Sequence, residues 1–371
     1  MIPPQRSRLA AALVLSLIVP LAAACHRRMA PPKPYLALVA NRAGKSVAVV
    51  NLSHFDVTRV IPLGFAPAKI AQRPAHPEVF VTSLTGQVAV IHFPELTLAG
   101  SFQTGRGPNQ LVFTRGGGAA YVLGGGGRTI FKIDCGSLRA LAAFHLASPL
   151  SSIALDSHRN TLLGKDSAEG TLVFIDAKNG KIKGSVETGK GVGSIVVTAD
   201  GGKAFVAAAG ADEVTAVDLA REQILSRIDV GSRPSLLVLK PDGGELFALS
   251  GPDSTMTILN VSYDSVEESH PSGADPVAAV FTRDSRWLYI ANAGDGAVTR
   301  FDVQNRRDFP VHVGITPQAL ALTPDERFLA VADSAAGRLT VIRAATGDLM
   351  TSIPVGANPV DVVIPGWIGK R

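Results

Sequence analysis

Residues 288–303 read LYIANAGDGAVTRFDV: an apolar run, a short polar loop that ends in glycine, a second run and an aspartate. Runs that resemble LYIAN recur along the chain, and successive starts are 40 to 44 residues apart. This period is that of a four-stranded propeller blade. The eight runs are YLALVA (35–40), VFVTS (79–83), AYVLG (120–124), TLLGK (161–165), AFVAA (204–208), LFALS (246–250), LYIAN (288–292) and FLAVA (328–332).

Each unit has the same internal order of four predicted strands. A polar loop and a second strand such as TLVFID (171–176) follow the apolar run, then come a third strand and a fourth such as PQALALTPDE (317–326). The fourth strands are almost continuously apolar, as expected when neighbouring blades cover both faces of a strand. With 37 Gly, 24 Pro and 18% charged residues, the composition favours short strands and tight turns. We therefore predict an all-β fold.

The turns recur in phase with the strands. Turns such as Lys240-Pro-Asp-Gly243 use Pro to preset φ and Asp or Gly to close the chain reversal. A second recurring piece, Gly-x-x-Pro, is expected to form the step from one blade to the next. It occurs at 64–67, 105–108, 231–234, 273–276, 314–317 and 356–359.

Together these features resemble the YVTN-type β-propeller repeat, a family of surface and periplasmic proteins. The resemblance covers Tyr35 to roughly Pro365 and implies a fold and a cell-envelope location, but it names no ligand. Eight units predict eight blades, with seven as the alternative if the third unit, with its Gly124–Gly127 run, fails to form a blade. The last segment, PVDVVIP (359–365), matches the innermost strand of a blade. It should complete the blade begun at Tyr35, a three-plus-one clasp that closes the ring.

The N-terminal segment has the features of an export signal. Residues 1–24 carry two arginines, an apolar run and a final Ala-Ala-Ala, and Cys25 follows directly. This stretch resembles the lipobox of bacterial lipoproteins, which implies lipidation of Cys25. The alternative is ordinary secretion with cleavage after Ala24. We assign 1–24 to a signal peptide, 25–34 to the lipidated cysteine and a Pro/Arg-rich tether, and 35–371 to the propeller.

The positive charge belongs to the leader and tether. Five of the 36 Lys and Arg precede Tyr35, where there is no acid, so 31 basic and 31 acidic residues remain for the rest. Bulk charge therefore gives no case for nucleic-acid binding. If Cys25 is lipidated, Cys135 is a lone thiol, so the fold must rest on its apolar core.

One polar position recurs at the end of the second strand of each unit and could be mistaken for a ligand ring. An Asp or Asn at a strand end is what an Asx turn requires, because its oxygen accepts a neighbouring backbone N–H. We interpret the position as structural. It holds Asn51, His92, Asp134, Asp176, Asp218, Asn260, Asp302 and Arg343.

Catalytic and metal motifs are not recognisable. The histidines are scattered without metal-ligand spacing, and the sequence contains no G-x-S-x-G. Gly124–Gly127 with Arg128 lacks the Gly-Lys-Ser/Thr of a phosphate loop, and Cys135 has no base nearby in sequence. We assign no catalytic residue, no metal and no cofactor.

Candidate binding residues are the charged side chains of the loops expected at the mouth of the channel. Basic residues come from the earlier units, namely Arg42, Lys45, Arg106, Arg128, Lys165, Lys190 and Arg233. Acidic residues come mainly from the later ones, namely Asp212, Glu213, Asp253, Asp275, Asp295 and Asp333. Such a face suits a polar ligand or a protein partner. The strongest candidates are Arg106, Lys190, Arg233, Asp275, Asn292 and Asp295.

The leading hypothesis is a monomeric cell-envelope lipoprotein that binds an envelope protein or a small polar ligand without catalysis of its own. Its lipid would hold it on the periplasmic face, at the outer membrane if the cell has two membranes; a secreted soluble protein is the alternative. A hydrolase that resembles propeller lactonases is a second hypothesis. A propeller of the d1-haem type is a third, although no histidine lies on a predicted blade-to-blade loop.

Overall fold

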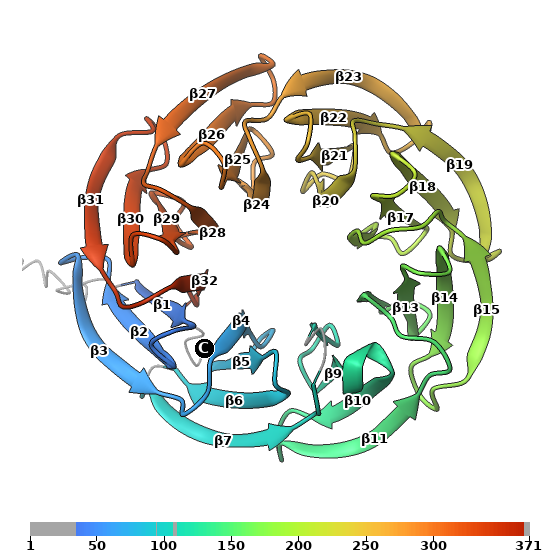
Figure 1. The fold of residues 1–371 in the computed structure, drawn as a ribbon, viewed down its shortest axis with the longest axis horizontal. Coiled ribbons are helices and arrows are strands. Elements are labelled where there is room, and N and C mark those ends of the chain that lie inside the picture. Colours follow the sequence, from blue (N-terminus) through green and yellow to red (C-terminus); the bar gives the residue numbers. More distant parts are fainter. Residues whose placement is uncertain (1–34, 94, 107–109, 367–371) are drawn as a thin grey trace, which may run out of the picture. The chain divides into compact units, whose positions relative to one another are not determined.

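The computed structural model describes residues 35–93, 95–106 and 110–366. Their strands form eight sheets, each of four antiparallel strands, arranged as the blades of one propeller (Figure 1). The eight-blade prediction is confirmed and the seven-blade alternative is wrong. The third unit forms a complete blade, and its glycine run is a 3-10 turn, η1 (Gly125–Gly127), at the loop between two strands.

Each blade has an inner, a second, a third and an outer strand. The inner strands of blades 1 to 8 are β32 (Pro359–Val363), β4 (Pro67–Gln72), β8 (Leu111–Phe113), β12 (Ser152–Asp156), β16 (Ile195–Val197), β20 (Pro234–Leu239), β24 (Pro276–Phe281) and β28 (Pro317–Leu322). The second strands are β1 (Leu36–Asn41), β5 (Glu78–Ser83), β9 (Ala119–Gly124), β13 (Thr161–Asp166), β17 (Lys203–Ala208), β21 (Glu245–Ser250), β25 (Trp287–Asn292) and β29 (Phe328–Asp333).

The other two strands of each blade lie farther from the centre of the ring. The third strands are β2 (Ser46–Asn51), β6 (Gln87–His92), β10 (Thr129–Asp134), β14 (Thr171–Asp176), β18 (Glu213–Asp218), β22 (Thr255–Asn260), β26 (Ala297–Asp302) and β30 (Arg338–Arg343). The outer strands are β3 (Asp56–Pro62), β7 (Thr97–Gln103), β11 (Arg139–His145), β15 (Ile182–Glu187), β19 (Gln223–Asp229), β23 (Ser265–Pro271), β27 (Arg307–His312) and β31 (Leu349–Pro354).

The ring closes as predicted. Strand β32, from the C-terminal end of the described chain, pairs antiparallel with β1, so that Leu38 lies opposite Val363 and Val39 opposite Val362. Blade 1 therefore has the strand order β3-β2-β1-β32. A closed ring leaves no blade without a neighbour on either side, which is how propellers protect their sheet edges.

The hydrophobic core lies between the blades. One cluster joins Ala37 and Val50 of blade 1 to Ala330, Leu339 and Val341 of blade 8, and comparable clusters join other neighbouring blades. The second and third strands are buried on both faces, which explains runs such as LALVAN and FLAVAD. The outer strands alternate or are mostly exposed, because one face meets solvent.

The Gly-x-x-Pro steps have two distinct physical roles. Pro begins the inner strand of five blades, a position where a strand loses nothing from a missing N–H. Gly273 has φ 96° and packs directly over the Asn292 side chain, so a Cβ atom there would collide with the amide group. The 105–108 step lies partly outside the described residues. The predicted signal peptide, Cys25 and the tether lie wholly outside them.

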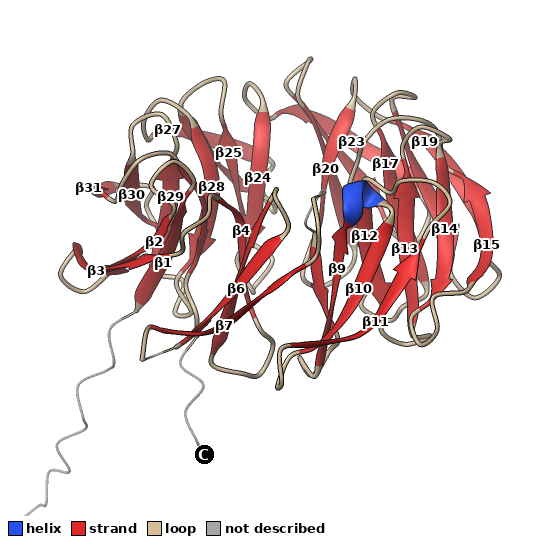
Figure 2. Cartoon of the chain, turned by 60° about the horizontal axis from the view of Figure 1, so that its bottom comes forward, coloured by secondary structure: helices blue, strands red, loops and turns tan. Residues whose placement is uncertain are grey.

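The loops lie on two opposite faces (Figure 2). We call one the mouth face: it holds the loops between second and third strands, such as 42–45, and the steps between blades, such as 63–66. Backbone hydrogen bonds join the two kinds of loop, including Leu63 N–H to the Lys45 carbonyl at 2.9 Å. We call the other the turn face: it holds the turns between inner and second strands, such as 282–286, and between third and outer strands, such as 303–306.

Candidate functional site

Five of the six strongest sequence candidates are exposed on the mouth face. Arg106, Lys190, Arg233 and Asp275 lie on steps between blades, and Asp295 lies in the loop between β25 and β26. The sixth, Asn292, does not face the mouth. It is the last residue of β25 and is buried, with its Nδ2 donating a 2.8 Å hydrogen bond to the Thr299 hydroxyl. The blade-7 step that contains Gly273 covers it.

Most acidic candidates of the mouth face make contacts that hold the fold; the exception is Asp275, whose exposed carboxylate makes no hydrogen bond or ion pair with another described residue. Asp212 accepts a hydrogen bond from the Arg233 N–H at 2.7 Å, and Asp295 accepts one from the Ala274 N–H at 2.5 Å. Asp253 accepts one from the Ser232 N–H in the same way. Each carboxylate thus holds a step between two blades, so the chain needs these acids whether or not a ligand binds.

The basic side chains of the mouth face are different. We define the basic arc as Arg42, Lys45, Arg106, Lys190 and Arg233. All five are exposed, and the side chain of none makes a hydrogen bond or an ion pair with another residue that the structure describes. No requirement of the fold explains them. Arg128 also lies on this face, but its guanidinium donates to the Ala147 carbonyl.

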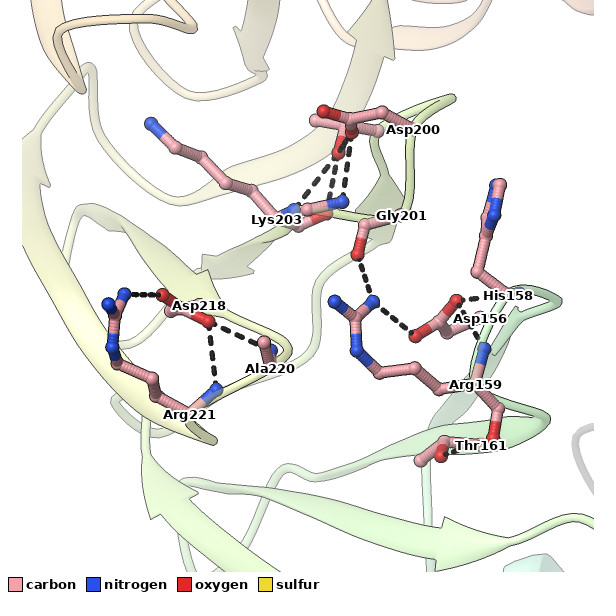
Figure 3. Close-up of polar contacts among 12 residues, drawn as sticks. Asp156, His158, Arg159, Thr161, Asp200, Gly201, Lys203, Asp218, Ala220 and Arg221 are labelled. Carbon is pink, nitrogen blue, oxygen red and sulfur yellow. Dashed lines mark hydrogen bonds and ion pairs between the residues drawn. The ribbon is translucent and has the colours of Figure 1, made fainter.

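On the turn face, by contrast, many cations are paired and join neighbouring blades. Arg159 contacts the Asp156 carboxylate at 3.1 Å and also donates to the Gly201 carbonyl of the next blade (Figure 3). Lys203 reaches Asp264 of the following blade at 2.7 Å. Arg306 of blade 7 likewise pairs with Glu268 of blade 6, while Arg73 with Glu78 and Lys240 with Glu245 are pairs within one blade. These contacts stabilise the ring.

The recurring Asp at the end of the third strands forms Asx turns, as predicted. Asp302 Oδ1 accepts the N–H groups of Gln304 and Asn305, both at 3.1 Å. Asp218 does the same for the N–H groups of Ala220 and Arg221 (Figure 3). The same contact is made by Asn51, Asp134, Asp176 and Asn260. This position is structural.

A second expectation from the sequence, that Lys165 is exposed on the mouth face, is wrong. It is fully buried on β13, where its ammonium donates to the Thr188 hydroxyl at 2.9 Å and to the Gly189 carbonyl. Burial lowers the pKa of Lys165 to about 8, and the nearby Asp166 only partly opposes this effect. Asp333 is also buried, and it accepts hydrogen bonds from the N–H groups of Ile315 and Thr316.

Cys135 and the histidines offer no catalytic arrangement. Burial raises the pKa of the Cys135 thiol to about 11, so the reactive thiolate is scarce at neutral pH. The described histidines lie in turns or on third and outer strands, and none lies on an inner strand. Among residues 35–93, 95–106 and 110–366, no group of three or more His, Cys, Asp or Glu could hold a metal ion. Within the same residues no helix is long and apolar enough to cross a membrane.

Sequence reasoning missed the polar side chains on the inner strands or directly before them. Three of them accept a hydrogen bond from a backbone N–H of the next inner strand and so join the blades along the channel. The pairs are Gln110 with Ile153 at 2.8 Å, Ser194 with Leu237 at 2.7 Å, and Asp361 with Ile70 at 3.0 Å.

The most unusual of these groups is Asp361, which lies 3.8 Å from the ammonium of Lys69. Burial raises the pKa of Asp361, while Lys69 and two backbone N–H groups lower it in part. Both residues stand two places after the Pro of a Gly-x-x-Pro step. In other blades the same place holds the apolar residues Leu236, Ala278 and Ala319. A charged residue at this otherwise apolar place is the sequence signal by which the pair could have been predicted.

Comparison with known proteins places the chain by fold. No family model matches it, and no curated protein matches it in sequence. Among solved structures it is similar to the dihydro-heme d1 dehydrogenase NirN in complex with DHE, at 14% identity and a TM-score of 0.73 over 89% of this chain and 75% of that one. It is also similar to AztD from Citrobacter koseri, at 14% identity and a TM-score of 0.71 over 91% and 99%.

A third similar structure is a functionally unknown protein from Desulfotomaculum acetoxidans, at 16% identity and a TM-score of 0.61 over 89% of this chain and 98% of that one. At these identities the likeness shows the propeller fold and not a shared activity. The comparisons and the structure support the resemblance to the YVTN-type repeat only as far as the fold, which is an eight-bladed propeller.

Proposed function

We propose that the protein is a cell-envelope propeller that binds a protein partner on its mouth face, with the basic arc against an acidic surface of that partner. The observation that carries this proposal is the contrast between the two faces. Specific contacts within the fold account for the mouth-face acids Asp212, Asp253, Asp295 and Asp333 and for many turn-face cations, whereas the side chains of the basic arc have none. Unpaired exposed charge of one sign is suited to electrostatic steering of an oppositely charged partner.

The spread of the basic arc favours a protein partner over a small ligand. Its members belong to blade 1 and to the steps that follow blades 2, 4 and 5, so they occupy separate sectors of the ring (Figure 1). They cannot all converge on one small molecule. Exposed apolar side chains also lie on this face, among them Val192, which is 60% exposed two residues from Lys190. A mixed apolar and cationic surface of this extent fits a protein interface.

The proposed location rests on the export signal and on where the chain enters the fold. Tyr35 precedes β1, whose far end, Asn41, meets a mouth-face loop, so the chain enters the propeller on the turn face. A lipid on Cys25 would thus be joined to the domain through the turn face. The mouth face would remain available to a partner. In a cell with two membranes we place the protein at the periplasmic face of the outer membrane.

Charge reversal of the basic arc tests the proposal. The variant Arg106→Glu, Lys190→Glu, Arg233→Glu is compared with a control of equal charge change on the turn face, Arg115→Glu, Lys178→Glu, Lys181→Glu. All six side chains are exposed. Proteins captured from solubilised envelopes should be lost from the mouth-face variant, kept by the control and weakened by salt. Capture that is unchanged in the mouth-face variant would refute the proposal.

A further inference from the structure

A cavity of about 320 Å³ lies at the inner edge of the ring between blades 2 and 3. Its wall is formed by inner strands β4, β8 and β12 together with side chains of β5. Its apolar wall comes from Phe80 and Leu111, which belong to the core between blades 2 and 3, and from Val112 and Ile153, which belong to the core between blades 3 and 4. The cavity lies beside the inner strand of blade 3, which is short: β8 has three residues, whereas β4 has six.

Three polar side chains line the same cavity, Lys69, Thr82 and Gln110, and two of them, Lys69 and Gln110, carry donors that could hold a ligand. Lys69 has a side chain that is 67% exposed, and among the described residues its ammonium has one ionic partner, Asp361, at the long distance of 3.8 Å. Gln110 uses its Oε1 to accept the Ile153 N–H, which leaves its Nε2 donor without a partner among the described residues. An apolar pocket of a few hundred Å³ with a few convergent polar groups is the usual form of a small-molecule site.

The available groups select for negative charge. Asp361 is less available to a ligand than Lys69: each of its oxygens already accepts a backbone N–H at 3.0 Å, from Ile70 and Val362, and its side chain is 15% exposed against 67% for Lys69. The groups that remain available to hydrogen-bond a ligand are therefore donors, namely the ammonium hydrogens of Lys69 and the side-chain amide of Gln110. A carboxylate complements both, and the apolar wall complements a short hydrocarbon chain.

We propose that this cavity binds a small amphipathic carboxylate, with its hydrocarbon chain against Phe80, Leu111 and Ile153 and its carboxylate at Lys69. The site lies within the inner wall of the ring. It is thus separate from the basic arc and independent of the partner proposed for the mouth face.

Calorimetric titration with octanoate tests this assignment, with octanamide and octylammonium as neutral and cationic probes of equal length. All measurements use the full-length chain with Cys25→Ser, so that no attached acyl chain can compete. Octanoate should bind roughly 10-fold or more tightly than octanamide, as expected for a hydrogen bond to a charged group. Lys69→Met should remove this preference, while Lys181→Met, at an exposed lysine of the turn face, should leave it unchanged.

Two more variants separate a lost site from a damaged fold. Ala71→Phe should fill the cavity and abolish octanoate binding, whereas Ala321→Phe, at the matching place in the inner strand of blade 8, should not. Asp361→Asn keeps an oxygen for the Ile70 N–H but removes the competing charge. It should strengthen octanoate binding roughly 2- to 10-fold and leave octanamide unaffected. Opposite effects of Lys69→Met and Asp361→Asn cannot arise from general loss of structure.

Several outcomes would overturn the proposal. Octanoate that does not bind at millimolar concentration, or that binds Ala71→Phe as well as the parent, would show that the cavity is not the site. Equal affinity for octanoate and octylammonium would show that Lys69 does not select the ligand.

Discussion

Replacement of Lys165 by Met is expected to change how stability depends on pH. The ammonium is fully buried, and its pKa falls from 10.5 to about 8 in the folded protein. The difference corresponds to about 3 kcal/mol, at about 1.4 kcal/mol for each pH unit. Below pH 8 both folded and unfolded chains carry the charge, so the folded protein bears the full cost. Between pH 8 and 10.5 only the unfolded chain binds the proton, so stability contributed by Lys165 rises with pH.

The assay is urea unfolding of wild type and Lys165→Met from pH 7 to 10.5. The free energy of unfolding of the wild type should rise relative to the variant by up to about 3 kcal/mol across this range. The comparison must be a difference, because burial raises the pKa of Tyr121, Tyr289 and Cys135. Those groups remove stability as pH rises, but they do so equally in both proteins.

A matched control fixes the interpretation. Lys181→Met removes an exposed lysine of the same blade and should give a difference from wild type that does not vary with pH. At neutral pH the net effect of Lys165→Met also contains the lost hydrogen bonds to Thr188 and Gly189, so only its pH dependence is diagnostic. A difference between wild type and Lys165→Met that stays constant from pH 7 to 10.5 would refute the reasoning.

Three further substitutions have defined outcomes in unfolding experiments. Tyr289→Phe should cost about 1–3 kcal/mol, because the buried hydroxyl donates to the Ala344 carbonyl at 2.6 Å and its loss leaves that carbonyl without its side-chain donor; an unchanged midpoint would contradict this. Asp302→Ala should cost about 1 kcal/mol and Asp302→Asn much less, since only the second keeps an acceptor for the turn; equal losses would argue against the Asx turn. Asp361→Asn should stabilise the protein at pH values above the raised pKa of Asp361, where the wild type holds a buried carboxylate, and the gain should shrink as pH falls through that pKa; a gain that grows at low pH would reverse the assignment.

The sequence was sufficient for the architecture because the propeller repeats its physical solutions. A strand buried on both faces, an Asx turn and a proline at the start of an inner strand each recur once in most blades. Their phase therefore predicts both the blade and the clasp between β1 and β32. The turn role of Asp302 was predictable for the same reason.

The direction of side chains at strand ends was not predictable in this way. Lys165 and Asn292 stand within two residues of a mouth-face loop, yet both are buried, like nearly all residues of their strands. The position of a residue along its strand predicts how near it lies to the mouth face. The pleat of the strand and the step between blades that covers it decide whether its side chain is buried or exposed. Lys69 and Asp361 are far apart in sequence and meet only because the ring closes between blades 1 and 2.

Photocrosslinking in living cells tests the central claim, that the mouth face is the partner surface, most directly. A photoreactive phenylalanine is placed at Val192 on the mouth face or at Tyr263, an 82% exposed residue of the turn face. The account predicts a discrete protein adduct from position 192, lost when Arg106, Lys190 and Arg233 are reversed to Glu, and none from position 263. An adduct from position 263 with none from position 192 would contradict it.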